Sequence, residues 1–329
     1  MKGYQFEDTQ GTFHLKKAEN ISYLYFPIAG EAGLKSSLTP NLGGDAKIDQ
    51  NTFLLEPVSA ENLVNNRNSR NFWCNVKGIG SWSLTGNAAE ALSKKFTEMQ
   101  DDSEVTAGFM WQKTTRESKK YQLRGDILSF IPVEKNVEVM LVTITNTGRM
   151  AQTVTPTAAI PLYGRSADNI RDHRHVTSLL HRIETTDTGV LVTPTLSFDE
   201  RGHQVNHMTY YCVGWSGNGE KPVDFYPTAE DFVGEGGNFE RPYAIVKNAE
   251  GVKAGTRIEG LEAVGGLHFS EVTLGPEEEC SYLIFTGITE DIQEIRNLSK
   301  TYTTREMVLE ELEKTKAYWQ EKVNVAYHT

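Results

Sequence analysis

Residues 165–182, which read RSADNIRDHRHVTSLLHR, contain four arginines, three histidines and two aspartates. The chain as a whole is acidic, with a formal net charge of -11. Guanidinium groups bind carboxylates, phosphates and other oxygen-rich groups through several directed hydrogen bonds. A local excess of arginine and histidine in an acidic chain therefore predicts a surface that holds an anionic or oxygen-rich ligand.

A metal site is one alternative for these histidines. If the segment were a strand, His173 and His175 would lie on the same side of it, because alternate side chains share a face, and His181 could add a third ligand. The arginines that flank these histidines would repel a cation, however. We therefore expect no metal at this position.

A purely structural role is a second alternative. The arginines of the segment could form ion pairs with Asp168 or Asp172 at the edge of a sheet, as surface arginines often do. The third alternative is recognition of an anion or a sugar. The residue types alone leave the structural and the ligand-binding alternatives open.

A second polar segment, NNRNSRNFWC, occupies residues 65–74. It combines amide and guanidinium donors, among them Arg67, with aromatic rings, among them Trp73, and such mixtures are found where proteins bind sugars. Asn and Arg are also ordinary loop residues. The residues themselves therefore favour a solvated loop that leads into a buried strand, with sugar contact as the alternative.

Composition excludes several other classes of function. An acidic chain with a pI near 5.3 lacks the broad basic surface that nucleic acids require. The N-terminus has no apolar signal segment, and no apolar run could span a bilayer, so we expect a cytoplasmic protein without a membrane partner. Its three cysteines, Cys74, Cys212 and Cys280, are too few and too far apart for a disulfide framework or a paired zinc site.

The elements that must position these side chains are mostly strands. Short runs rich in Val, Ile, Thr, Tyr and Phe alternate with turn residues as far as residue 289. The clearest strand predictions are residues 21–27, 72–76, 105–111, 137–145, 208–215 and 280–285. Several of these runs are apolar on both faces, which is typical of strands in stacked sheets. The sequence thus predicts a mainly β protein built on a large antiparallel β-sandwich.

Helical periodicity becomes strong only near the C-terminus. Val308, Leu312, Thr315, Trp319 and Val323 are spaced by three and four residues, which predicts a helix beginning near residue 304. A shorter helix is expected over residues 291–299, with Ile292 and Ile295 turned inward. The segment PNLGGDAKIDQ, residues 40–50, lacks the motifs of a phosphate-binding loop and predicts a tight turn instead.

Three segments together resemble a known family. FPIAGEAGLKSSLTPNLGGDAKIDQNTF, NNRNSRNFWC and YGRSADNIRDHRHVTSLLHR are similar to the N-terminal region of the inverting glycoside phosphorylases of glycoside hydrolase family 94, formerly glycosyltransferase family 36. The likeness is greatest to the branch that acts on β-1,2-linked oligoglucans, with related modules in cyclic β-1,2-glucan synthases. It extends over nearly the whole chain.

This resemblance implies an architecture. In the family, a supersandwich of the galactose-mutarotase type is followed by a helical linker and an (α/α)6 barrel, which holds the catalytic aspartic acid and most contacts to the co-substrate, inorganic phosphate. Residues 1–289 would form the supersandwich, and residues 290–329 the linker. The resemblance therefore implies a chain that has no catalytic residues and no cofactor of its own and is inactive alone. Such a chain would work with a barrel subunit, form one wall of the active site and form a homodimer.

The same resemblance implies a set of substrate-binding residues for a β-glucan oligosaccharide. These are Arg165, Asn169, Arg171, Asp172, His173, Arg174 and His175, together with Arg67 and Trp73. One alternative is a stand-alone carbohydrate-binding or mutarotase-like protein, in which His173 or His175 would face a carboxylate across an open cleft. Another is a dimerisation module whose charged cluster forms only ion pairs.

Overall fold

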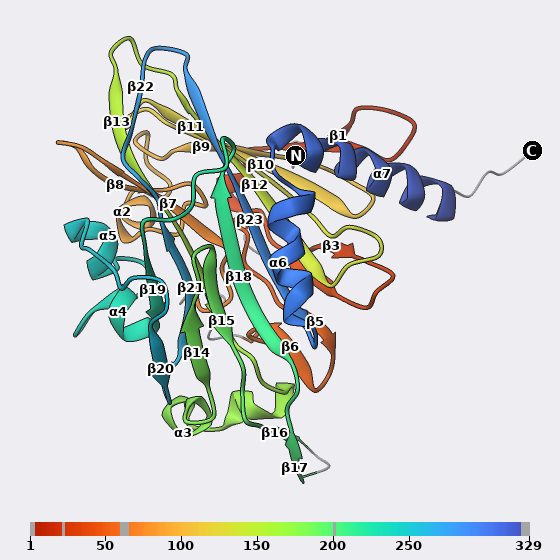
Figure 1. Ribbon diagram of the computed structural model, residues 1–329. Helices are drawn as coiled ribbons and strands as arrows, with labels where there is room; N and C mark the ends of the chain where they lie inside the picture. The colour runs from red at the N-terminus through yellow and green to blue at the C-terminus, as the bar shows by residue number, and fades with distance from the viewer. Residues whose placement is uncertain (1–3, 22–23, 60–65, 200–201, 324–329) are drawn as a thin grey trace, which may run out of the picture.

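The computed structural model of the protein describes residues 4–21, 24–59, 66–199 and 202–323. Its two largest sheets, of eleven and six strands, are antiparallel throughout and pack against each other across one apolar core (Figure 1). The predicted fold class, mainly β with a large antiparallel sandwich, is confirmed. In the part of the chain that the structure describes, no helix has the length and apolar character needed to cross a bilayer.

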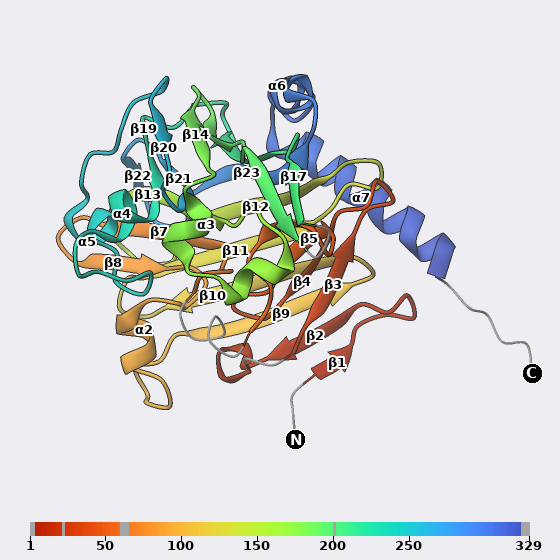
Figure 2. The same ribbon diagram turned by 90° about the horizontal axis from the view of Figure 1, so that it is seen from below.

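The large sheet runs across the whole molecule (Figure 2). In spatial order its strands are β1 (Tyr4–Phe6), β2 (Phe13–Lys16), β9 (Asp102–Gly108), β10 (Trp111–Ser118), β11 (Leu123–Phe130), β12 (Val137–Asn146), β23 (Glu279–Thr289), β18 (Thr209–Ser216), β15 (Gly189–Val192), β14 (Arg182–Thr185) and β20 (Arg257–Glu259).

The second sheet covers the inner face of the first. In spatial order its strands are β19 (Asp224–Thr228), β21 (Ala263–His268), β13 (Gln152–Leu162), β7 (Asn71–Val76) and β8 (Gly80–Ser83), and β22 (Val272–Leu274) also pairs with β13. Two smaller sheets are formed by β3 (Phe26–Ala29), β4 (Lys35–Leu38), β5 (Ala46–Asp49) and β6 (Thr52–Leu55), and by β16 (Leu196–Asp199) and β17 (Gly202–Val205).

Helical segments are short except at the C-terminal end. They are η1 (Ala18–Asn20), α2 (Ala89–Ser93), η2 (Ala167–Arg171), α3 (Arg174–Ser178), α4 (Ala229–Val233), α5 (Tyr243–Lys247), α6 (Ile292–Thr301) and α7 (Arg305–Val323). The short α2, α4 and α5 cover the outer face of the six-stranded sheet, whereas α6 and α7 lie on the outer face of the large sheet (Figure 1).

Strand β12 shows why a run that is apolar on both faces predicts a strand between two layers. All ten of its residues are buried. Val142 and Ile144 face the core between the sheets, while Val139 and Leu141 face the layer formed by α6 and α7. The second face is therefore covered by helices, so a strand in this position must be apolar on both sides.

Helices α6 and α7 share a core with the large sheet. Leu298 of α6 and both Val308 and Leu312 of α7 belong to the same apolar cluster as Phe285 of β23. The helix predicted to begin near residue 304 is confirmed, although Val323 at its end is exposed. The prediction for Ile292 is wrong, because this side chain is 41% exposed and Leu298 is buried in its place.

Two strand predictions need correction. Residues 105–111 do not form one strand, because β9 ends at Gly108 and Met110, in the left-handed region with φ of 60°, turns the chain into β10. In residues 21–27 the strand β3 begins only at Phe26, and residues 22–23 lie outside the described residues. The turn predicted in residues 40–50 is confirmed at Leu42 and Gly44, both of which have positive φ.

Candidate functional site

The arginine-rich segment follows β13 and is fixed to β6 through its backbone. Tyr163 N donates to Leu54 O at 2.8 Å, Gly164 N donates to Phe53 O at 3.1 Å, and Phe53 N donates to Arg165 O at 3.0 Å. Gly164 has φ of +61°, a conformation that glycine adopts without strain. The backbone of this segment is thus held at the edge of the core, with η2 and α3 after it.

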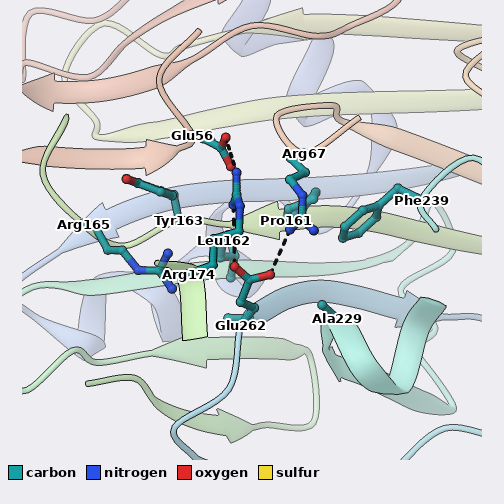
Figure 3. Close-up of a pocket in the computed structure, with 11 residues that line it drawn as sticks. Glu56, Arg67, Pro161, Leu162, Tyr163, Arg165, Arg174, Ala229, Phe239 and Glu262 are labelled. Atoms are coloured by element: carbon teal, nitrogen blue, oxygen red, sulfur yellow. Dashed lines mark hydrogen bonds and ion pairs between the residues drawn. The ribbon is translucent and has the colours of Figure 1, made fainter. Parts of the chain in front are cut away.

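Three of the predicted site residues line one cleft. Arg165 and Arg174 of the arginine-rich segment face Arg67 of the earlier polar segment there, together with Glu56 and Glu262 (Figure 3). The cleft has about 310 Å³ of empty volume, which includes its open mouth. We call it the arginine cleft. Its enclosed space is only about 20 Å³, room for a group of about the size of one hydroxyl, so a sugar would enter it by one edge.

Charged side chains form a chain of contacts across the arginine cleft. Arg174 Nη2 donates to Glu56 Oε1 at 2.5 Å, and Arg174 Nη1 lies 3.6 Å from Glu262 Oε1. Arg67 Nη1 donates to Glu262 Oε2 at 2.9 Å. The arginines thus do form ion pairs, but with these two glutamates. No such pair with Asp168 or Asp172 occurs among the described residues.

Arg165 differs from the other two arginines because no carboxylate in the described part of the chain pairs with it. Its side chain is only 6% exposed, it forms no ion pair with the described residues, and its Nε has no hydrogen-bond partner there. Its guanidinium lies 5.1 Å from the centre of the Tyr163 ring, a cation–π contact. Burial lowers the pKa of Arg165, which is the expected response of a cation removed from water.

Further polar atoms at the cleft lack hydrogen bonds. Within the described part of the chain, Tyr163 Oη has no partner, and Glu262 Oε1 is within ion-pair range of Arg174 but too far away for a hydrogen bond. Buried polar atoms without partners usually mark a bound water or ligand. Arg165 needs an acceptor, and Glu262 needs a donor. Hydroxyl groups supply both, whereas a fully ionised oxyanion supplies only acceptors and would be repelled by the two glutamates.

The other predicted site residues of the segment do not line this cleft. Asn169 is buried, and its Nδ2 donates to Asp172 Oδ2 at 2.8 Å, so this pair holds the turn between η2 and α3. Arg171, His173 and His175 are exposed. The assumption that these histidines lie on a strand is wrong, because His173 occupies the N-cap position of the short helix α3 and His175 lies within that helix. The centres of the two rings are 5.3 Å apart.

His181, the third histidine, is fully buried behind the cleft. Its Nδ1 lies 3.2 Å from Leu261 O, the residue before Glu262. Burial, followed by the positive charge of Arg165, lowers the pKa of His181 to about 3. The ring is therefore neutral at physiological pH and donates its Nδ1–H to the carbonyl. Among the described residues, no group of three His, Cys, Asp or Glu side chains could hold a metal ion.

Trp73 lies outside the arginine cleft. It belongs to β7, is 1% exposed and packs with Ala159 and Phe232 in the apolar cluster on the outer face of the six-stranded sheet. The prediction that residues 65–74 form a solvated loop is wrong for their centre. Arg70 is 1% exposed, and its guanidinium donates to Glu138 across the sandwich at 2.5 and 2.9 Å.

Four residues of the arginine cleft could not be selected from the sequence. Glu56 and Glu262 are two of 44 acidic residues, and nothing in their neighbourhood distinguishes them. Tyr163 stands two positions before Arg165, and this proximity to the arginine-rich segment was the one sequence signal for any of the four. Phe239, whose ring lies 5.6 Å from the guanidinium of Arg67, is brought in by a distant loop.

A supersandwich with a cleft of arginine and glutamate side chains suited to hydroxyl groups defines a carbohydrate-related module. The family model described as "Glycosyl hydrolase 94, supersandwich domain" matches residues 56–305, about three quarters of the chain. The chain therefore belongs to glycoside hydrolase family 94 through its supersandwich domain. A search of curated proteins finds no match.

Comparison with solved structures finds low sequence identity throughout. A bacterial glucoamylase complexed with acarbose is 8% identical over 97% of this chain and 37% of its own, with a TM-score of 0.54. A provisionally named kojibiose phosphorylase from the human microbiome is 8% identical over 97% of this chain and 39% of its own, with a TM-score of 0.46. A provisionally named aldose 1-epimerase of Escherichia coli K12 is 9% identical over 81% and 99% of the two chains, with a TM-score of 0.43. The chain spans less than two fifths of the first two structures.

Proposed function

We propose that this chain is the supersandwich module of an inverting β-glucoside phosphorylase whose substrate is a β-1,2-linked oligoglucan. The arginine cleft contacts the hydroxyl groups of the sugar and forms one wall of the active site. Residues 290–329 lead from the supersandwich toward an (α/α)6 barrel, which provides the proton donor and binds inorganic phosphate. We further propose that the module contributes no catalytic residue and acts in the cytoplasm as a homodimer.

One observation supports this proposal most directly: the arginine cleft contains unpartnered donors and unpartnered acceptors at the same time. Arg165 Nε–H is a donor, Glu262 Oε1 is an acceptor, and Tyr163 Oη can serve as either. Vicinal hydroxyl groups of a pyranose ring match this combination. The membership of the chain in family 94 supports a carbohydrate-related role, and the resemblance to the inverting phosphorylases of this family suggests the class of reaction.

Calorimetry with β-1,2-gluco-oligosaccharides tests the binding part of the proposal. The wild-type chain should bind, and Arg174→Ala should weaken binding by about tenfold or more, because hydrogen bonds from charged groups contribute roughly 1.5–3 kcal/mol. Arg257→Ala is the matched control, since Arg257 is exposed and, among the described residues, forms an ion pair with Glu184 alone, at the edge of the large sheet. A wild-type chain that binds no β-1,2-glucan would overturn the proposal.

Reconstitution tests the catalytic part. The chain should release glucose 1-phosphate from a β-1,2-oligoglucan and phosphate only when a family 94 barrel is present, in the same polypeptide or as a second subunit. Release by the purified chain on its own would show that it contains its own proton donor, and the non-catalytic assignment would then be wrong. No release from any combination with a barrel would contradict the phosphorylase assignment.

A further inference from the structure

A second cleft lies at the edge of the six-stranded sheet, where β8 is the last strand among the described residues. It is bounded by β8, by α2 and by the segment that leads into α5, and Trp73 closes its floor. Its cavity volume is about 470 Å³, against about 20 Å³ for the enclosed part of the arginine cleft. Space of this size accommodates more than one sugar unit.

The two clefts share a wall. Phe239 lines the arginine cleft, and the next two residues, Glu240 and Arg241, line the second cleft. On the facing segment, Arg67 contacts Phe239, while Asn66 Nδ2 donates to Glu240 Oε1 at 3.2 Å. Consecutive residues are only about 3.8 Å apart. A ligand held in one cleft therefore needs to cross little more than the Asn238–Arg241 turn to reach the other.

That turn is well ordered by hydrogen bonds. Arg241 N donates to Asn238 O at 3.2 Å and to Asn238 Oδ1 at 2.8 Å, and Ala89 N at the start of α2 donates to Glu240 O at 2.7 Å. Asn66 Nδ2 also donates to Asn87 O at 3.0 Å. Hydrogen bonds thus tie the wall between the clefts to the start of α2 and to Asn66.

The charges of the second cleft cancel. Lys120 and Arg241 are balanced by Glu90 and Glu240, so the cleft suits a neutral polar ligand and not a polyanion. Burial alone would raise the pKa of Glu90, but hydrogen bonds from Lys120, Lys94 and Tyr121 lower it to about 2. Glu90 is therefore a fixed acceptor, while the exposed guanidinium of Arg241 forms no ion pair with the described residues and can donate to a ligand.

Apolar side chains complete the walls. Ile79 is 40% exposed and Val246 is 38% exposed, and both line the cleft. A pyranose ring has apolar C–H faces and a polar rim of hydroxyl groups, so it can pack against these side chains while its hydroxyl groups reach the charged residues. Clefts that combine apolar walls with a few converging polar groups are the usual form of small-ligand sites.

We propose that the second cleft is a glycan subsite continuous with the arginine cleft, so that the ligand is an oligosaccharide whose chain crosses the Asn238–Arg241 turn. This inference rests on the proposed function, because it takes the arginine cleft as a sugar site. It adds a prediction about chain length: a disaccharide contacts only the arginine cleft, and longer chains gain contacts with Arg241, Val246 and Ile79.

The test is calorimetry with a series of linear β-1,2-gluco-oligosaccharides, from the disaccharide upward, on the wild-type chain and on Arg241→Ala and Val246→Ser. Both substituted side chains are exposed, so folding should be unaffected. Wild-type affinity should rise by about tenfold over the series, and each substitution should lower the affinity for long chains by about fivefold. Affinity for the disaccharide should stay within about twofold of wild type. Arg257→Ala should change neither.

The outcomes separate this inference from the proposed function. Binding that does not tighten with chain length, or an Arg241→Ala variant that loses equal affinity for short and long chains, overturns the second subsite and leaves the arginine cleft as a sugar site. If long chains bind and Arg174→Ala has no effect on them, the continuity of the two clefts is wrong. If no oligosaccharide of any length binds, the proposed function and the second subsite fail together.

Discussion

Arg174 and Glu56 are joined by a hydrogen bond of 2.5 Å although 118 positions separate them in the chain. Glu56 is 3% exposed, whereas the side chain of Arg174 is 31% exposed. The short helix α3 thus anchors a guanidinium over a buried carboxylate at the end of β6. This pair links the arginine-rich segment to the opposite wall of the arginine cleft.

Removal of Arg174 should destabilise the protein as well as weaken sugar binding. The Arg174→Ala variant leaves the buried carboxylate of Glu56 with less compensation, and we expect a loss of about 1–3 kcal/mol in the free energy of unfolding. Urea unfolding measures this loss. Arg257→Ala, which breaks an exposed pair, should change the free energy by less than about 0.5 kcal/mol. Equal effects of the two substitutions would show that the Arg174–Glu56 pair has no special role.

Buried His181 should make the protein less stable in acid. Its folded-state pKa of about 3 lies below the ordinary value of 6.5, so the unfolded chain binds the proton more readily. The contribution of His181 is therefore complete above about pH 6.5 and is lost as the pH falls toward 3. The difference between wild type and His181→Asn should shrink by up to about 1.4 kcal/mol per pH unit in this window. Urea unfolding at several pH values checks this, and a pH-independent difference would contradict it.

Asp224 and His268 form a second buried pair, with Oδ1 and Nδ1 2.7 Å apart. Asp224→Ala removes the carboxylate that contacts Nδ1 of this ring and leaves Nδ1 with the weaker 3.4 Å contact to Tyr226 Oη. We expect a loss of about 1–3 kcal/mol in the free energy of unfolding. The control is Asp187→Ala, because Asp187 pairs with Lys221 at the surface. Thermal unfolding that places both variants at the wild-type midpoint would disprove the importance of the buried pair.

The C-terminal helices should unfold together with the sandwich. Leu312 is 4% exposed and packs against the large sheet, so Leu312→Ala should cost about 2–5 kcal/mol and lower the midpoint of a single transition. Circular dichroism at a helix-sensitive wavelength and tryptophan fluorescence should report the same midpoint. Lys314→Ala, on the exposed side of α7, is the control. Two separated transitions would show that α7 folds independently of the sheet.

The sequence was sufficient for features that depend on local pattern. Val137–Asn146 is apolar on both faces because two layers cover it, and Val308, Leu312 and Trp319 mark the buried face of α7 through helical spacing. The arginines at 165 and 174 were recognisable because they stand close together in an acidic chain. Each of these signals lies within a short stretch of residues.

The rest depends on contacts between distant segments. Glu262 binds Arg67 although 195 positions separate them in the chain. Phe239 lies in a loop whose sequence gives no signal for its contact with Arg67. Residues 173–178 contain too few turns for helical periodicity to be visible, so His173 and His175 could be taken for strand residues. Arg70 was placed in solvent because its buried partner, Glu138, lies on another sheet.

The consecutive positions of Phe239, Glu240 and Arg241 have an evolutionary consequence. Insertion or deletion of a single residue in that turn would displace the aromatic wall of one cleft and the charged wall of the other at once. Relatives with a turn of different length should therefore differ in both clefts together. If both clefts bind sugar as proposed, preference for the terminal sugar and preference for chain length would then change together among relatives.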